Sequence, residues 1–171
     1  KIYASTMNED ALAYRKQRGL DKLDEQMALL VQRVSGAQQK DYFFPDLAGV
    51  GFSYNTYVWN KEINPEDGML RVVFGLGTRA VNRVDGDYPR MLALADPLRR
   101  PYAEKEDLRK YSQHDVDLID TKENVLRTVS FNDLSYKNAY RYSSRFAAKD
   151  YESMSLMNQK DENRDYWILT L

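Results

Sequence analysis

Hydrophobic and small polar positions alternate most clearly over residues 49–54, where Val50, Phe52 and Tyr54 fall on one face of an expected strand. The other face carries only glycine and serine, so another group can approach the backbone closely there. The Asn-Pro-Glu-Asp-Gly run that ends at residue 68 is a strong turn signal. Residues 69–74 then read as a returning strand, which predicts an antiparallel hairpin or meander.

Further patterns predict elements on both sides of this hairpin. A short polar cap at Asn8 and the acids after it favour a helix to about Arg18, which Gly19 would end. The apolar run Met27–Val34 favours a buried strand, and Gly36–Pro45 reads as a loop. The remaining expectations are a helix at 78–83 capped by Thr78, strands at 91–95 and 166–171, an exposed helix at 104–111, and a hairpin pairing 116–119 with 125–129.

The mixture of hairpins and flanking helices predicts an α+β fold, with a mainly antiparallel sheet, rather than a parallel α/β sheet. Pro97 and Pro101 mark a boundary between two parts of the chain. We therefore expect residues 1–100 to be one part of a nucleotide-binding domain. Residues 101–171 would be its C-terminal continuation or a connecting subdomain.

Composition narrows the classes of function. Hydrophobic residues make up 43% of the chain and charged residues 30%, which is ordinary for a globular protein. The net charge of −1 argues against nucleic acid or a membrane surface as a partner. The absence of cysteine excludes disulfides and thiolate chemistry, and it suits a cytoplasmic protein. Because the chain begins with Lys1, we expect it to be a piece of a longer protein.

The bend Gly75–Thr78 is the first candidate for chemistry, because glycines let backbone N–H groups face an anion. A glycine pair of this kind is also common in ordinary turns. Arg79, Arg83 and Arg90 follow the bend and are candidates for a basic rim around a phosphate, since guanidinium groups hold phosphate oxygens in pairs. The alternative is a solvated face that pairs with the two aspartates of the 85–87 turn.

Three ordered segments carry a resemblance to a known family. They are MALLVQRVSG, DYFFPDLAGVGFSYN and GMLRVVFGLGTRAVNRVDGDYPR. Their order and spacing resemble the ATP-grasp nucleotide-binding domain of the phosphoenolpyruvate synthase / pyruvate phosphate dikinase family over roughly residues 10 to 95. The resemblance is to a fragment of that domain, from a divergent branch.

The resemblance implies a nucleotide site with two parts. A strand-end hinge would contact the adenine through backbone groups, and the glycine bend would lie near the phosphates and magnesium (Mg²⁺). Arg79 would also have a catalytic role, by stabilising phosphate charge. The cofactor-binding residues implied in this way are Val31, Gln32, Arg33, Val34, Gly75, Gly77, Thr78 and Arg79.

Two positions depart from the family pattern. Typical members carry acidic residues just before the Gly-Leu-Gly strand end and just after the second glycine, whereas this chain has Arg71 and Thr78 there. Magnesium prefers carboxylate, phosphate and water oxygens, so neither side chain suits it. The metal ligands are therefore unknown from the sequence.

The resemblance implies a piece of an ATP-dependent phosphotransferase. In this reading ATP phosphorylates a carrier histidine on another domain, which passes the phosphoryl group to pyruvate to form phosphoenolpyruvate. The alternative is a degenerate ATP-grasp relative that acts as a non-catalytic nucleotide-binding, structural or regulatory module. We expect the piece alone to be inactive and, because it would expose apolar surface, to self-associate as a homo-oligomer.

Overall fold

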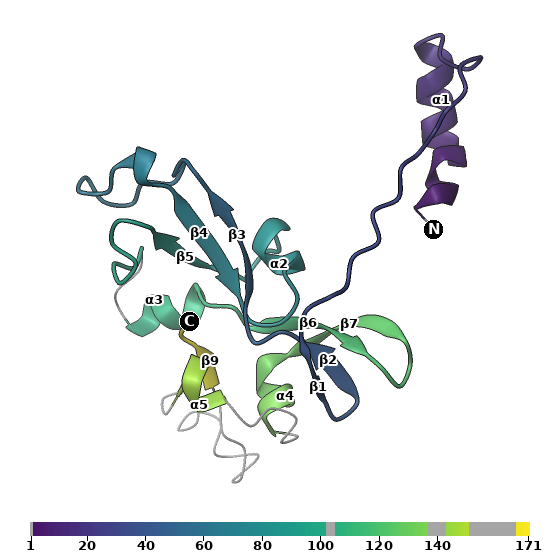
Figure 1. Ribbon diagram of the computed structural model, residues 1–171. Helices are drawn as coiled ribbons and strands as arrows, with labels where there is room; N and C mark the ends of the chain where they lie inside the picture. Colours follow the sequence, from purple (N-terminus) through teal and green to yellow (C-terminus); the bar gives the residue numbers. More distant parts are fainter. Residues whose placement is uncertain (1, 102–104, 137–142, 151–166) are drawn as a thin grey trace. The chain divides into compact units, whose positions relative to one another are not determined.

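The computed structural model describes residues 2–101, 105–136, 143–150 and 167–171 (Figure 1). The chain divides into two compact units, residues 1–34 and 35–171. The domain boundary expected at residue 100 falls within the second unit and stays a prediction. Within the described residues, no helix is long and apolar enough to cross a membrane.

The first unit contains the short 3-10 helix η1 (Tyr3–Met7) and the helix α1 (Glu9–Gln17). Acidic residues begin α1 and basic residues end it, as the helix dipole favours. Gly19 follows with a φ of 66°, the left-handed conformation that commonly ends helices. The predicted helix is therefore confirmed, although the Asn8 side chain makes no capping hydrogen bond. No residue of α1 is buried.

The strand predicted at Met27–Val34 is wrong. These residues have no regular secondary structure, and Leu30 and Val31 are 77% and 92% exposed. An apolar run forms a strand only when another backbone segment satisfies its N–H and C=O groups. None of the described residues pairs with this run.

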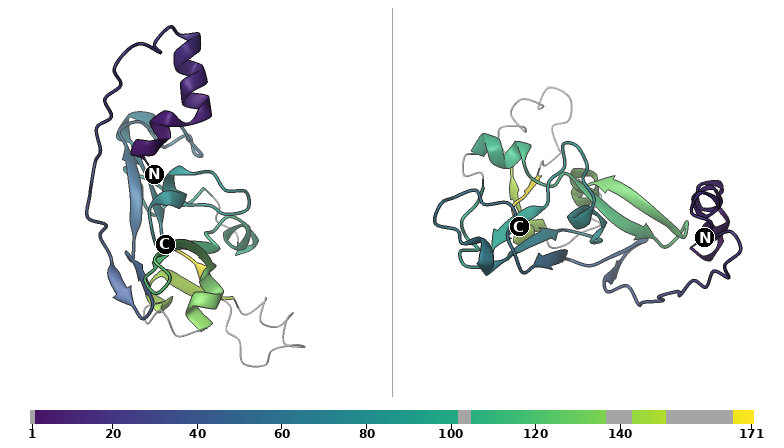
Figure 2. Two further views of the ribbon diagram at one scale, coloured as in Figure 1. Left: turned by 90° about the vertical axis from the view of Figure 1, so that its right-hand side faces the viewer. Right: turned by 90° about the horizontal axis from the view of Figure 1, so that it is seen from above.

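The second unit is built from antiparallel sheets, which confirms the predicted α+β class (Figures 1 and 2). One sheet has the strand order β1-β2-β6-β7, another β3-β4-β5, and a third pairs β8 with β9. The strands are β1 (Ala37–Gln39), β2 (Tyr42–Phe44), β3 (Ala48–Phe52), β4 (Met69–Val73), β5 (Arg90–Ala93), β6 (Asp115–Asp120), β7 (Val125–Ser130), β8 (Ala147–Lys149) and β9 (Trp167–Leu169). The helices are η2 (Pro65–Asp67), α2 (Thr78–Val81), α3 (Lys105–Lys110), α4 (Phe131–Tyr136) and α5 (Ser143–Phe146).

Both predicted hairpins are present. β3 pairs with β4 so that Val50 lies opposite Arg71, and β5 joins the other edge of β4 with Met91 opposite Arg71. β6 pairs with β7 over their full lengths. The strands expected near 91–95 and 166–171 and the helix expected at 104–111 are also found, as β5, β9 and α3, although Glu104 and Tyr166 lie outside the described residues.

Two local predictions are wrong. The segment 36–45 is not a loop but contains the β1-β2 hairpin, whose tight turn places Lys40 at a φ of 54°. The sequence hides this turn because the left-handed residue is a lysine rather than a glycine. Helix α2 ends at Val81, before Arg83, and the Thr78 side chain does not cap it. The Thr78 hydroxyl instead donates a hydrogen bond to Asp117.

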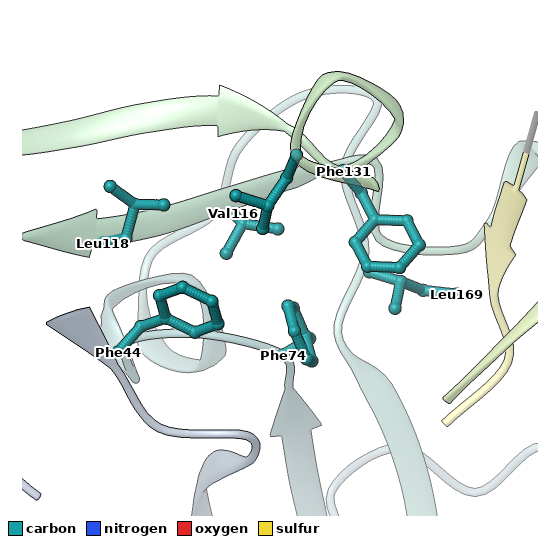
Figure 3. Packing of buried hydrophobic residues seen from close by; sticks show 7 residues of the cluster. Phe44, Phe74, Val116, Leu118, Phe131 and Leu169 are labelled. Atoms are coloured by element: carbon teal, nitrogen blue, oxygen red, sulfur yellow. The ribbon is translucent and has the colours of Figure 1, made fainter. Parts of the chain in front are cut away.

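A cluster of aromatic and aliphatic side chains forms the main core (Figure 3). Phe74, which follows β4, packs its ring edge to face against Phe44 and Phe131, with centroids 5.6 and 5.4 Å away. Val116 and Leu118 of β6 complete this part of the cluster. The core therefore holds the end of β4 against β6, and it fixes where the glycine bend begins.

Candidate functional site

The glycine bend packs directly against β6. Gly75 has a φ of 88°, and a Cβ atom there would lie 2.5 Å from Val116 Cγ1 and 2.8 Å from the Asp117 carbonyl oxygen. The Leu76 N–H donates to that carbonyl over 2.9 Å. Glycine is thus required at position 75 both for the backbone conformation and for close approach to β6.

A buried glutamine fixes the residue before the bend. The Gln113 side chain accepts from the Phe74 N–H and donates to the Phe74 carbonyl, both at 2.8 Å. The same amide nitrogen donates to the Asp115 carbonyl over 2.7 Å. Gln113 is 4% exposed, and these bonds satisfy its buried amide group. They also satisfy the backbone N–H and C=O of Phe74, as pairing with a neighbouring strand would.

Arg79 joins three carboxylates beneath the bend. Its Nε donates to Asp117 Oδ1 over 3.0 Å, its Nη1 donates to Asp87, and its Nη2 lies 3.7 Å from Asp115 Oδ2. Burial lowers the pKa of Arg79, but the hydrogen bond to Asp117 and the charges of Asp87 and Asp117 outweigh that effect and raise the pKa above its ordinary value. The pairing with the 85–87 turn, which the sequence left open, is therefore present at Asp87.

Asp117 is the acceptor at the centre of this network. Thr78 Oγ1 and Thr128 Oγ1 each donate to it over 2.6 Å, in addition to Arg79. Burial raises the pKa of Asp117, but these three hydrogen bonds outweigh it and hold the pKa below its ordinary value. Its carboxylate is therefore charged at neutral pH and accepts hydrogen bonds from Thr78, Arg79 and Thr128.

A cavity of about 630 Å³ opens beside this network in the second unit. Residues of the β3-β4-β5 sheet form one wall, including Phe52, Met69, Arg71 and Met91. The register places Phe52 opposite Met69 and Met91 opposite Arg71, so these four side chains share one sheet face. The residues 82–85 and 87–90, part of α3, and the end of the chain form the other walls.

Four arginines line the cavity: Arg71, Arg83, Arg90 and Arg100. Among the described residues, none of them forms an ion pair. Arg90 donates to the Pro97 carbonyl, and Arg100 donates to the main-chain oxygens of Thr170 and Leu171. Main-chain oxygens, rather than carboxylate side chains, therefore hold Arg90 and Arg100 in place.

Arg90 is the most constrained of the four. Burial and then the charge of Arg100 lower the pKa of Arg90 to about 10, which still leaves it charged at neutral pH. Its buried Nε has no hydrogen-bond partner in the described structure, and neither does the buried hydroxyl of Ser112 in the same wall. Two neighbouring guanidinium groups in a half-buried wall favour the binding of an anion, which would offset their repulsion.

Aromatic rings border the same cavity. Tyr88 and Tyr111 lie edge to face with their centroids 5.3 Å apart, and Phe52 and Tyr57 are 41% and 45% exposed. Exposed rings offer a face on which a planar base stacks. The cavity thus combines groups suited to phosphate with groups suited to a base.

The structure separates the residues that the sequence singled out. Arg83 and Arg90 line the cavity, whereas Gly75, Gly77, Thr78 and Arg79 do not. The expected hinge residues 31–34 belong to the first unit and are exposed. Sequence reasoning missed Arg100, for which no local pattern gives a signal. It treated Arg71 only as a departure, although the alternation of β4 places Arg71 on the face of Met69.

The described residues do not fit a magnesium site. They contain no group of three or more histidine, cysteine, aspartate or glutamate side chains that could hold a metal ion. Asp87, Asp115 and Asp117 come together, but around the Arg79 guanidinium. Asp120 is 4% exposed, accepts from the N–H groups of Lys122 and Glu123, and pairs with Arg127.

Comparison with known proteins gives one match. The family model for the pyruvate phosphate dikinase AMP/ATP-binding domain matches residues 1–157. No curated protein matches the chain, and no solved structure does. The matched range includes all three segments on which the resemblance rests, and the α+β architecture with antiparallel sheets is consistent with an ATP-grasp-like nucleotide-binding domain. The chain therefore belongs to the pyruvate phosphate dikinase AMP/ATP-binding domain family.

Proposed function

We propose that the chain is the ATP-binding part of a phosphotransferase and that its arginine-lined cavity contacts the phosphates of ATP. The observation that carries the proposal is a group of four arginines around a cavity of about 630 Å³, none of which pairs with an acidic side chain of the described residues. That volume lies within the range of small-molecule sites, roughly 300–1,000 Å³. The exposed rings of Phe52 and Tyr57 would support the adenine.

The chemistry of such a site is charge neutralisation. As the terminal phosphoryl group leaves ATP, negative charge spreads over its oxygens, and preorganised cations lower the barrier. In the longer protein the phosphoryl group would pass to a carrier histidine on another domain and then to pyruvate. Pyruvate and phosphoenolpyruvate would bind to those other domains rather than to this one.

Several finer assignments remain proposals. They are the adenine hinge at residues 31–34, the phosphate contacts of Gly75, Gly77 and Thr78, and the catalytic role of Arg79. The contacts of Arg79 with Asp87 and Asp117 already explain why this arginine is present. The cytoplasmic location and the homo-oligomer also stay predictions.

Magnesium is implied by the resemblance, but the residues described here do not fit an ion held by the protein. The proposed phosphoryl transfer therefore gives no role to a magnesium ion held by the protein. Any ion that accompanies ATP would be held by the phosphate oxygens and water, as is common for this cation.

A second function is favoured by one observation. Arg71 and Thr78 stand where the family pattern has acids, and the Thr78 hydroxyl is committed to Asp117. A non-catalytic nucleotide-binding module would tolerate both changes. A longer protein that binds ATP but neither hydrolyses it nor phosphorylates a carrier histidine would support this alternative.

Isothermal titration of ATP into the full chain tests the proposal. We expect saturable binding that weakens at least tenfold in Arg90→Gln and in Arg83→Gln, since one charge-assisted hydrogen bond contributes about 1.5–3 kcal/mol. Lys122→Gln is the matched control, because it removes one positive charge from the exposed β6-β7 turn. Absence of ATP binding at millimolar concentration, or equal losses in the control, would overturn the proposal.

A further inference from the structure

Among the described residues, the acidic side chains of the cavity do not pair with its four arginines. Three aspartates also line it, at positions 85, 87 and 107. Asp87 is engaged by Arg79 and by the N–H groups of His114 and Asp115. In the described structure, the other two make no ion pair with any of the four arginines. A bound anion would therefore meet four guanidinium groups that no carboxylate side chain of the described residues engages.

The geometry of the wall suits an extended anion rather than a single small one. Arg71 is in the middle of β4, Arg83 follows α2, and Arg90 begins β5, so the guanidinium groups approach the cavity from separate elements. Arg100 lies near Arg90, because its charge contributes to the shift at that residue. A chain of several phosphates offers oxygens to donors spread in this way, and guanidinium groups bind such oxygens in pairs.

The same arrangement disfavours a metal ion held by side chains. Arg71 occupies the centre of the sheet face that borders the cavity, and its positive charge repels a divalent cation. The nearest acidic network is already filled by Arg79, Thr78 and Thr128. Two further carboxylates line the cavity, Asp85 and Asp107, but among the described residues they belong to no group of three or more metal-binding side chains, whereas four guanidinium groups suited to phosphate are present.

We propose that the cavity binds the polyphosphate chain of a nucleotide through guanidinium groups alone, without a metal ion held by the side chains of this unit. The inference rests on the proposed ATP-binding function and names the chemistry by which that site works. Arginine charge takes the neutralising role that a protein-bound cation would otherwise have. Free tripolyphosphate should be a ligand in its own right, whereas adenosine should bind weakly or not at all.

Titration calorimetry with the full chain tests the inference with three ligands, ATP, inorganic tripolyphosphate and adenosine, each in excess EDTA and in excess magnesium chloride. We expect ATP and tripolyphosphate to bind in EDTA with affinities at least equal to those in magnesium. The reason is that magnesium neutralises the phosphate charge that the arginines recognise. Adenosine should bind at least tenfold more weakly than ATP.

The outcomes separate the two proposals. Binding of ATP that is more than threefold weaker in EDTA than in magnesium overturns this inference and leaves the proposed function standing. Failure of ATP to bind under either condition overturns both. Binding of adenosine as tight as that of ATP also overturns the inference, because it would show that the base rather than the phosphate chain is recognised.

Variants at Arg71 test whether the charge of this side chain contributes to the affinity for tripolyphosphate. Arg71→Glu introduces the carboxylate that the family pattern has there, and we expect at least a tenfold loss of tripolyphosphate affinity in EDTA. Arg71→Lys keeps the charge and should stay within about fivefold of the original affinity. The exposed Arg83→Gln carries the test if Arg71→Glu does not fold, and Lys122→Gln should leave the affinity unchanged. Equal affinity in Arg83→Gln and the original chain would overturn the inference.

Discussion

The Thr78 hydroxyl donates a hydrogen bond to Asp117 Oδ2 over 2.6 Å, across 39 positions of sequence. This contact joins the glycine bend to β6. A carboxylate therefore does lie beside position 78, although β6 supplies it and its oxygens are occupied by Thr78, Arg79 and Thr128. Thr78 thus has a structural role, because its hydroxyl ties the glycine bend to Asp117 of β6.

Replacing Asp117 with asparagine should destabilise the second unit. The change removes the charge that Arg79 pairs with and leaves a largely buried guanidinium with fewer acceptors. We expect a loss of about 2–4 kcal/mol in the free energy of unfolding, measured by urea denaturation. Thr128→Ala is the control, because it removes one hydrogen bond to the same carboxylate at an exposed position and should cost about 1 kcal/mol or less. Equal losses in the two variants would contradict this role for Asp117.

The stability contributed by Asp117 should depend on pH in a defined direction. Because its pKa is lower in the folded chain than its ordinary value of 3.8, the unfolded chain takes up the proton at higher pH. The stabilisation is therefore present above about pH 4 and is lost as the pH falls through the folded pKa. Urea midpoints of the original chain and Asp117→Asn, measured between pH 6 and pH 3, should converge toward acid. A constant difference over this range would rule out the linkage.

Alanine at position 75 should be far more costly than alanine at position 86. Both glycines have positive φ angles, 88° and 77°, so both substitutions carry a backbone penalty of about 1–2 kcal/mol. Only at Gly75 does the new Cβ collide, since it would meet Val116 and the Asp117 carbonyl, whereas nothing lies within 4 Å at Gly86. We expect thermal unfolding to show the larger loss for Gly75→Ala. Similar melting temperatures in the two variants would argue against close packing of the bend on β6.

Local patterns predicted the local elements of this fold. Alternation in β3, the turn before β4 and the acidic start of α1 each carry a signal within a few residues, and each element is present. The run Met27–Val34 failed because hydrophobicity alone does not supply a pairing partner. The β1-β2 hairpin was missed because Lys40 adopts a conformation usually associated with glycine or asparagine.

The cavity could not be predicted in the same way. Its arginines come from four separate segments, and only tertiary packing brings Arg100 near Arg90. The sequence grouped Arg79 with Arg83 and Arg90 as a basic rim, but α2 ends between Arg79 and Arg83. Arg79 then turns to the acids of β6 and the 85–87 turn, while Arg83 borders the cavity. Residue type was a sound guide to the chemistry, and spacing was a poor guide to position.

The most direct test of the arginine-lined cavity as the nucleotide site is a backbone amide NMR titration of the full chain with ATP. We predict that the largest shift changes fall on residues 82–91, on Arg71 and its neighbours in β4, and around Ser112. Resonances of the β6-β7 turn at residues 121–124 should stay unchanged. Saturable shifts that leave the cavity residues unaffected would contradict the account.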